Sequence, residues 1–208
     1  MMRFIDHDDG VLRFTWRHAA ELLDAVCGIF KIVEHPDADG AGVTRIVPDH
    51  RRTNHSSPLG FTHHELNLHT DGSATSNPAE YLLVAVEQAA SYGGDAIVAD
   101  CTKAYAKLSA RAKNQLEESF SFAGTMWPVY MNNADQPIFR YRSDGQLLPQ
   151  TNASAKALDE FRTILLSNSC QISLPSNHGY LVKNHTWTHG RTTFQGDRIA
   201  LRILLDRR

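Results

Sequence analysis

The sequence lacks any run of about 18 apolar residues, so it holds no stretch able to cross a membrane as a helix. It also lacks a strong charge of either sign. The 21 Lys and Arg against 23 Asp and Glu leave a formal net charge of −2, which offers no electrostatic basis for binding nucleic acid. The N-terminal segment is acidic and has no apolar signal-peptide core. We therefore expect a cytoplasmic protein.

Cysteine is scarce as well. Cys27, Cys101 and Cys170 are odd in number, lie in apolar stretches and do not have the spacing of a zinc motif. This favours three buried thiols in a reducing compartment over a disulfide framework.

The remaining composition is typical of a globular protein, with 42% hydrophobic and 21% charged residues. We find no repeat, no low-complexity tract and no linker that would divide the chain. A chain of 208 residues is long enough to bury a substantial core. We expect residues 1–208 to form a single domain.

Hydrophobic periodicity predicts the secondary structure. Helices are expected at about 17–26, 102–118 and 153–168, and a loop at 124–136. Strands are expected at about 29–33, 59–68, 80–86, 96–99, 137–142, 171–174, 179–183, 186–193 and 198–206. Because the strands cluster early and late with helices between them, we expect a mainly β (α+β) fold, a sandwich or jelly roll with flanking helices.

One histidine and one carboxylate have a spacing that suits a metal site. His69 and Asp71 are two residues apart, which on a β-strand places both side chains on one face. If the downstream segment 184–191 brings His189 beside them, the set becomes two histidines and one carboxylate. This facial triad leaves coordination positions open and suits non-haem Fe(II) oxygenases. His185 is a rival ligand or a donor to the ligands.

The His-x-Asp spacing alone is weak, because the chain has 11 histidines and the spacing recurs. His7 and Asp9 are rejected because they lie in an acidic cluster near the N-terminus. His35 and Asp37 are rejected because Pro36 breaks strand geometry and the segment is rich in turn residues.

The surroundings of His69 and His189 carry a longer pattern. An apolar strand, a Gly93-Gly94-Asp95 turn and a second apolar strand follow Asp71. The downstream part holds Asn184, His189-Gly190-Arg191, Phe194, Arg198 and Arg202. In this order the motifs resemble the taurine dioxygenase/clavaminate synthase-like family of Fe(II)- and 2-oxoglutarate-dependent oxygenases, over about residues 58–102 and 172–205. The resemblance implies a double-stranded β-helix (jelly roll, cupin-like), in which distant segments meet at one mouth.

The resemblance implies Fe(II) held by His69, Asp71 and His189, with 2-oxoglutarate and O2 as cosubstrates. It implies that Arg198 binds the distal carboxylate of 2-oxoglutarate through its planar fork. Arg202, four residues later, is implied to lie near the cosubstrate or an anionic group of the substrate. The implied reaction oxidises, most simply hydroxylates, an unactivated C–H bond and releases succinate and CO2. Desaturation and ring formation stay open.

The substrate is not readable from the sequence. The arginines favour a small amino-acid-like or natural-product acid, and Leu66, Asn67 and Trp187 are expected near the pocket because they flank the ligands. The polar segment 48–58 is expected to be a surface loop, or a lid in which Arg51, Arg52 or His55 touches substrate. Neither nucleic acid nor a membrane is expected as a partner, and the oligomeric state stays open.

One position departs from the family. Members often have a threonine after Gly-Gly-Asp whose hydroxyl helps to hold 2-oxoglutarate, whereas this chain has Ala96. Binding is then weaker, or another group such as Thr193 supplies the hydroxyl. The chain is also compact for this family, which favours short lid segments.

Two alternatives stay open. The first is a Zn(II) or Fe(II) hydrolase or cupin-type dioxygenase that uses the same three ligands and has no need of Arg198. The second is a non-catalytic jelly-roll binding module with a degenerate metal site. Ala96 favours the second alternative, and the intact set of His69, Asp71, His189 and Arg198 weighs against it.

Overall fold

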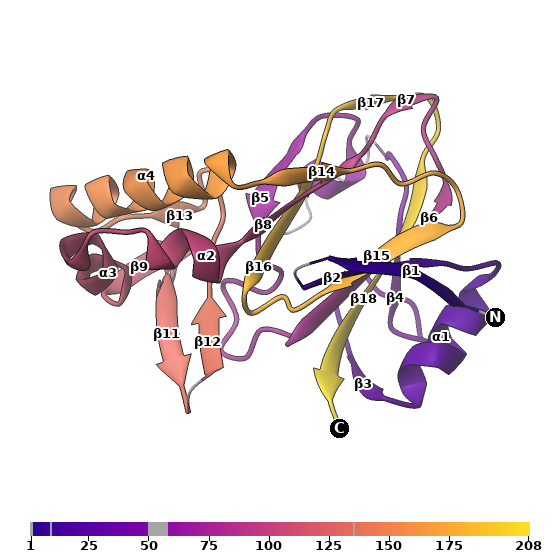
Figure 1. Cartoon of the computed structure of the whole chain (residues 1–208), viewed down its shortest axis with the longest axis horizontal. Helices are drawn as coiled ribbons and strands as arrows, with labels where there is room; N and C mark the ends of the chain where they lie inside the picture. Colours follow the sequence, from indigo (N-terminus) through magenta and orange to yellow (C-terminus); the bar gives the residue numbers. More distant parts are fainter. Residues whose placement is uncertain (1, 9, 50–57, 135) are drawn as a thin grey trace.

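Two antiparallel sheets face each other, and a helical lobe extends from one end of them, at the left of Figure 1. The computed structural model describes residues 2–8, 10–49, 58–134 and 136–208. The expected mainly β fold with flanking helices is confirmed. Arg51, Arg52 and His55, expected on a lid, lie outside the described residues.

The larger sheet has seven strands, and every pairing in it is antiparallel. Its order is β1 (Arg3–Asp8), β2 (Val11–Thr15), β15 (His178–Val182), β6 (Tyr81–Gln88), β18 (Ile199–Arg207) and β3 (Phe30–Val33), with β4 (Val43–Ile46) also paired to β18. The last strand of the chain therefore lies beside the strand that follows the His69–Asp71 motif.

The smaller sheet holds both histidine segments. Its order is β14 (Cys170–Ile172), β8 (Ala96–Asp100), β16 (Trp187–Arg191) and β5 (Leu66–His69), and a two-stranded ribbon joins β17 (Phe194–Gln195) to β7 (Tyr92–Gly93). Strand β16 lies between β8 and β5, so the downstream histidine segment is paired directly with the upstream one.

Strand β6 explains why residues 80–86 are almost continuously apolar. Leu82 and Val86 belong to the core between the two sheets. Leu83 and Ala85 belong to the core on the outer face, which helix α1 (Ala19–Cys27) covers. An antiparallel strand that is buried on both faces loses the usual alternation of apolar and polar residues.

Residues 101–169 form the helical lobe between β8 and β14. It contains α2 (Cys101–Ala106), α3 (Ala110–Leu116), α4 (Asn152–Ser167) and the short strands β9 (Ser119–Phe122), β10 (Thr125–Pro128), β11 (Tyr130–Asn133), β12 (Gln136–Phe139) and β13 (Leu147–Leu148). Its core continues into the smaller sheet through Leu68 and Ala99.

Three predicted elements differ from the structure. The single helix expected at 102–118 is two helices, because Asp100 caps α2 and Ser109 caps a new start at α3. The loop expected at 124–136 contains β10 and β11, since Ala123 and Gly124 adopt positive φ angles (48° and 90°) and turn the chain into a hairpin. The strand expected at 59–68 begins with a 3-10 turn, η1 (Pro58–Phe61), and reaches strand geometry only at β5.

The prediction of three buried thiols is wrong for two of them. Cys101 is buried, whereas Cys27 and Cys170 are exposed. Cys27 ends α1 and Cys170 begins the edge strand β14, positions where apolar neighbours in sequence do not imply burial.

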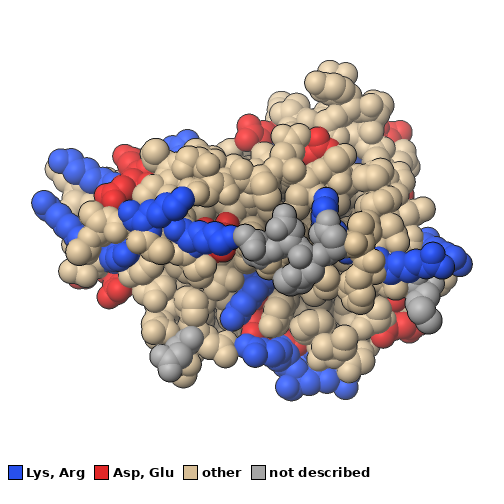
Figure 2. All heavy atoms as spheres, in the orientation of Figure 1, with Lys and Arg blue, Asp and Glu red and all other residues tan. Residues whose placement is uncertain are grey.

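On the face seen in Figure 2, Lys and Arg atoms lie close to Asp and Glu atoms over the helical lobe. This is the solvated charge pattern expected for the outer surface of α3 and α4. No helix among the described residues is long and apolar enough to cross a membrane.

Candidate metal centre

A cavity of about 420 Å³ lies between the two sheets. Its wall includes residues of β5, β6, β8, β15, β16 and β18 and the loop that follows β5. His69, Asp71 and His189 all line it, as do Arg198, Arg202 and Leu66. Segments that are far apart in the sequence therefore meet at one site, as the resemblance implied.

His69 and Asp71 converge for a different reason from the one predicted. Strand β5 ends at His69, and Asp71 lies in the turn beyond it rather than on the strand. The His69 Nε2 and Asp71 Oδ1 atoms are 3.9 Å apart. The His69 Nδ1 atom is 2.8 Å from the Asn67 carbonyl oxygen, so Nδ1 carries the hydrogen and Nε2 is left as the electron-pair donor.

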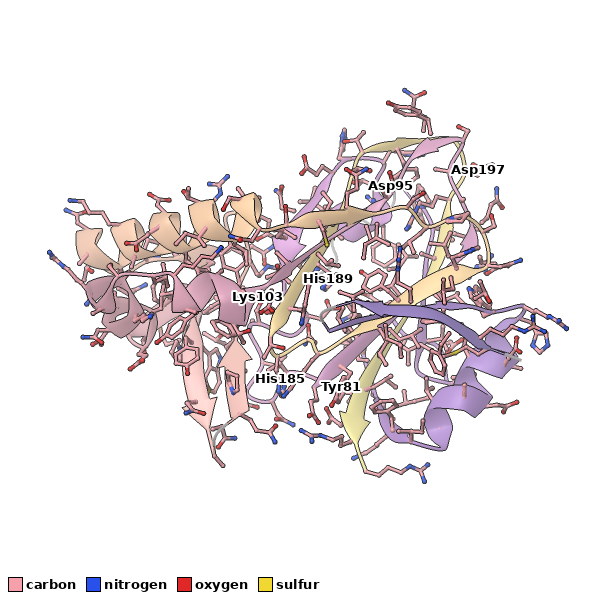
Figure 3. The ribbon with its side chains drawn as sticks, in the orientation of Figure 1. Tyr81, Asp95, Lys103, His185, His189 and Asp197 are labelled. Carbon is pink, nitrogen blue, oxygen red and sulfur yellow. The ribbon has the colours of Figure 1, made fainter. Side chains whose placement is uncertain are left out.

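His189 enters from the neighbouring strand. It pairs with His69 in the register of β16 and β5, and the two ring centroids are 4.1 Å apart. Its Nε2 atom is 3.8 Å from Asp71 Oδ2. The ligand atoms of the three residues all lie within 4.8 Å of one another, which is close enough for one metal ion. Figure 3 shows His189 on β16 beside the space between the sheets.

Gly190 makes this close strand pairing possible. A Cβ atom at this position would lie 2.5 Å from the Leu66 carbonyl oxygen, so only glycine fits. The register also shifts here, because His189 and Arg191 pair with His69 and Leu66. The extra residue in β5 turns Leu66 and His69 to the same side.

The irregular pairing places Leu66 and Asn67, two of the three residues expected near the pocket, on different sides of β5. Leu66 lines the cavity, whereas the Asn67 side chain is exposed and lies away from it. Asn67 contributes through its backbone carbonyl alone. Trp187 is likewise absent from the described wall of this cavity, because it lies near the other end of β16.

Asn184 anchors the loop of residues 70–80 between β5 and β6, here called the metal loop because it carries the candidate ligand Asp71. It is 1% exposed, and its side-chain oxygen accepts a hydrogen bond of 2.8 Å from the Asp71 backbone N–H. Its amide nitrogen donates to the carbonyl oxygens of Asp71 (3.0 Å) and Ala79 (2.8 Å). One side chain thus satisfies three buried backbone groups at the two ends of the loop.

Burial and neighbouring charges keep His69, His189 and Asp71 in the protonation states that a metal ion requires. Burial lowers the pKa of His69, and burial together with His69 lowers the pKa of His189 to about 3. Burial alone would raise the pKa of Asp71, but Arg202 and the two histidines lower it well below its ordinary value. Near neutral pH the site therefore offers two neutral imidazoles and one carboxylate.

The donor atoms fit a divalent cation. The buried Asp71 Oδ2 atom has no hydrogen-bond partner among the described residues. An unpartnered carboxylate oxygen in a buried site is costly unless a ligand or an ion compensates for it. Two nitrogen donors and one oxygen donor suit Fe(II) with open coordination positions.

Arg202 touches the carboxylate of the proposed metal ligand. Its Nη1 atom donates to Asp71 Oδ1 over 3.1 Å, which fixes the orientation of that carboxylate. Its Nη2 atom lies 3.1 Å from His35 Nδ1. His35 and Asp37 are absent from the cluster of possible ligands among the described residues, yet both line the cavity. The start of the turn-rich segment, residues 34–37, therefore reaches the site although it supplies no ligand.

Arg198 is buried over the Phe194 ring, with 5.8 Å between its guanidinium carbon and the ring centroid. It is 6% exposed and lines the cavity just before β18 begins. Burial lowers its pKa, and Tyr180 and Asp95 act against this through space. Its guanidinium makes no hydrogen bond to any described residue. A Cβ atom at Gly94 would lie 3.1 Å from the Arg198 side chain, so the Gly-Gly turn leaves room for it.

The family model described as "Taurine catabolism dioxygenase TauD, TfdA family" matches residues 7–142. The chain belongs to this family. The match covers more than half of the chain and includes His69 and Asp71, while His189 and both arginines lie beyond it. Their placement beside His69 and Asp71 therefore rests on the tertiary structure. A search of curated proteins finds no match.

Solved structures share this fold. Asparagine oxygenase in complex with Fe(II), 2S,3S-3-hydroxyasparagine and succinate is similar with a TM-score of 0.76 and 20% identity over 91% of this chain and 66% of that one. A second asparagine oxygenase structure has a TM-score of 0.78 and 20% identity, covering 90% and 63%. The oxygenase OrfP with Fe and alpha-ketoglutaric acid has a TM-score of 0.69 and 18% identity, covering 85% and 60%. The chain thus spans less than two thirds of the length of these proteins.

Several features of this TauD/TfdA-type site were not predicted. Arg142 lines the cavity, and its side chain forms an ion pair with Asp144. Its backbone forms an isolated antiparallel β-bridge with His69. Tyr180 lines it from β15. No local signal marks either residue, because each reaches the site through strand pairing.

Two of the residues suggested for supporting roles do not reach the site. Thr193, suggested as a substitute hydroxyl, is exposed and lies away from the cavity, because it precedes the outer ribbon β17. His185, the rival ligand, is 2.9 Å from the Pro78 carbonyl oxygen and lies apart from His189 in Figure 3.

Proposed function

We propose that residues 1–208 form one oxygenase domain that uses Fe(II), 2-oxoglutarate and O2 to hydroxylate a C–H bond of a small amino-acid-like substrate, releasing succinate and CO2. The observation that carries the proposal is the buried Arg198, which makes no hydrogen bond to a described residue, in the same cavity as the His69, Asp71 and His189 cluster. A hydrolase or a cupin-type dioxygenase would need the cluster but not the arginine.

His69, Asp71 and His189 would hold Fe(II), and the bound metal would supply the activation of O2. The protein prepares this site through three contacts. The Asn67 carbonyl sets the tautomer of His69, Arg202 orients the Asp71 carboxylate, and Asn184 holds the Asp71 backbone. These contacts reduce the reorganisation that metal binding requires.

Arg198 would bind the distal carboxylate of 2-oxoglutarate. Burying a guanidinium without a hydrogen-bond acceptor costs free energy. A carboxylate ligand would offset this cost through two charge-assisted hydrogen bonds. The apolar parts of the wall, including Leu66, Leu174 and Leu204, would limit the access of water to the reacting atoms.

The substrate class is supported by the charges around the cavity. Arg142, which pairs with Asp144, and Arg202, which pairs with Asp71, place positive charge on its wall, and Glu34 and Asp37 place negative charge there. A zwitterion with one carboxylate and one ammonium group would match both. The asparagine oxygenase and OrfP structures contain hydroxylated amino acids, 2S,3S-3-hydroxyasparagine and (3S)-hydroxy-L-Arg.

The test is an anaerobic titration of the Fe(II)-loaded protein with 2-oxoglutarate, following the visible metal-to-ligand charge-transfer band. We expect the band in the wild type and its loss in His189→Ala. The matched control is His185→Ala, which removes a nearby histidine outside the cluster and should keep the band. Metal binding without a band would favour the hydrolase or cupin alternative, and no metal binding would favour the non-catalytic module.

A positive titration leads to the substrate. Amino acids would be added to the anaerobic complex, and a substrate is expected to shift the band because it binds beside the metal. Exposure to O2 should then give succinate and a product heavier by one oxygen atom in equal amounts. Succinate with no modified amino acid would contradict the proposed substrate class.

A further inference from the structure

Tyr180 lies in the middle of β15 and is 1% exposed. Across the larger sheet it pairs with Val84, and Val84 pairs with Arg202. Directly paired residues of antiparallel strands project from the same face, and all three line the cavity. Tyr180 is therefore part of the wall that carries the arginines of the proposed cosubstrate site.

The hydroxyl group of Tyr180 has no protein partner among the described residues. No hydrogen bond joins it to any of them. Burial raises the pKa of Tyr180 above its ordinary range, so the phenol keeps its proton and remains a donor at neutral pH. Buried tyrosine hydroxyls usually find a hydrogen-bond partner, and a donor that faces a cavity can find one in a ligand.

Asp71 and Arg198 line the same cavity as Tyr180. Asp71 is at the metal end of the proposed 2-oxoglutarate site, and Arg198 is at the end that would bind the distal carboxylate. Tyr180 therefore lines the space that 2-oxoglutarate would occupy.

Ala96 faces the same space from the smaller sheet. It is 4% exposed, lines the cavity and belongs to the same buried cluster as Tyr180. Its methyl group cannot donate a hydrogen bond. The side of the cavity that β8 provides therefore lacks a hydroxyl, whereas β15 supplies one.

We propose that Tyr180 donates a hydrogen bond to the distal carboxylate of 2-oxoglutarate beside Arg198 and so supplies the hydroxyl that Ala96 lacks. This inference rests on the proposed function, since it assigns a further residue to the same cosubstrate site. It makes Tyr180 a cosubstrate-binding residue of this chain.

The first experiment compares the wild type with Tyr180→Phe. Both Fe(II)-loaded proteins are titrated with 2-oxoglutarate without oxygen, and the Kd is taken from the charge-transfer band. The variant should bind about ten- to a hundredfold more weakly, because it loses a hydrogen bond to a charged group. Its melting temperature without ligand should be unchanged or higher, since the deleted hydroxyl has no protein partner.

A second ligand tests which part of the cosubstrate is contacted. The compound 2-oxopentanoate has a methyl group in place of the distal carboxylate. Wild type and Tyr180→Phe should bind it with equal Kd values. If the variant weakens both 2-oxo acids by the same factor, Tyr180 shapes the site in general and the proposed contact is wrong.

A rescue and a control complete the design. Adding Ala96→Thr to Tyr180→Phe should restore a large part of the affinity for 2-oxoglutarate, which a purely structural role of Tyr180 does not predict. Tyr141→Phe removes another buried phenol, 2% exposed in the core of the helical lobe, and should leave the Kd unchanged.

The outcomes separate the two proposals. A wild-type band with an unchanged Kd in Tyr180→Phe would overturn the role of Tyr180 and leave the oxygenase proposal intact. The absence of any band in the wild type, despite bound Fe(II), would overturn the oxygenase proposal and this inference with it.

Discussion

Buried arginines are treated differently in the two regions around the metal loop. Beside the loop, Arg140 donates to the carbonyl oxygens of Thr75 (3.2 Å) and Ser76 (3.0 Å) and lies over the Trp127 ring. In the cavity, Arg198 also lies over a ring, that of Phe194, but donates to none of the described residues. Because a buried guanidinium needs acceptors, the first arginine serves the fold and the second points to a ligand.

Arg191 and Arg202 extend the comparison. Arg191 donates to the carbonyl oxygens of Thr62 (2.8 Å) and His64 (2.7 Å) and so secures the segment that leads into β5. Arg202 pairs with Asp71. The order Arg140, Arg191, Arg202, Arg198 thus runs from structural support toward ligand binding. Four variants can break or sharpen this contrast.

The largest effect is expected for Arg198→Met. Removing the cation should weaken 2-oxoglutarate binding about a hundredfold or more, because the distal carboxylate would lose its charged partner. The free energy of unfolding of the metal-free protein should stay the same or rise, since an uncompensated buried charge disappears. Anaerobic titration and urea denaturation measure the two quantities. A clear loss of stability would assign Arg198 to the fold instead.

Asn184→Ala should show the opposite pattern. It leaves three buried backbone groups of the metal loop without a partner. The free energy of unfolding should fall by about 3 kcal/mol, and Fe(II) affinity should fall as Asp71 loses its support. The control is Asn67→Ala at the exposed asparagine beside His69, where urea denaturation should detect a change within about 0.5 kcal/mol.

Arg140→Met should destabilise the protein by about 2 kcal/mol. The effect is smaller than for Asn184 because the loss of two carbonyl contacts is partly offset by relief of guanidinium burial. The Kd for 2-oxoglutarate should remain within about threefold of the wild type, since Arg140 serves the fold rather than the cavity. A large loss of affinity with intact stability would erase the contrast between the two regions.

The smallest effect, counted per pH unit, concerns His189. The pKa of His189 is lowered from 6.5 to about 3 by burial, so the folded, metal-free protein resists protonation that the unfolded chain accepts. The stability from this group is fully present above pH 6.5 and is lost as the pH falls toward 3. The loss is at most about 1.4 kcal/mol per pH unit. Urea denaturation at several pH values should show a shallower slope for His189→Gln, and equal slopes would contradict the shifted pKa.

Strongly patterned parts of the fold were predicted well. Helices α1 and α4 and strands β3, β6, β8, β15, β16 and β18 all lie within a few residues of their expected ranges. In each of these elements, the apolar positions in the sequence match the side chains that the fold buries. The strands β1, β2 and β4 were not predicted, and the short hairpins of the lobe were partly missed, because their stability depends on partners that are distant in sequence.

The candidate ligands could be chosen because motif order adds information that spacing lacks. His69, Asp71 and His189 were selected from 11 histidines and several similar spacings. The supporting residues could not be chosen in the same way. Tyr180 reaches the cavity because strand β15 pairs with β6, and His35 reaches it from a turn. Neither residue is marked by a local sequence pattern.

The sequence by itself determined the kind of chemistry and the residues that could perform it, since residue type and motif order are local properties. The tertiary structure decided which polar groups satisfy one another. Asn184 and Arg191 look as functional in the sequence as Arg198 and Arg202 do. Asn184 and Arg191 nevertheless hold backbone groups, while Arg198 donates a hydrogen bond to none of the described residues. That distinction depends on hydrogen bonds between segments that only folding brings together, so no reading of the chain alone can make it.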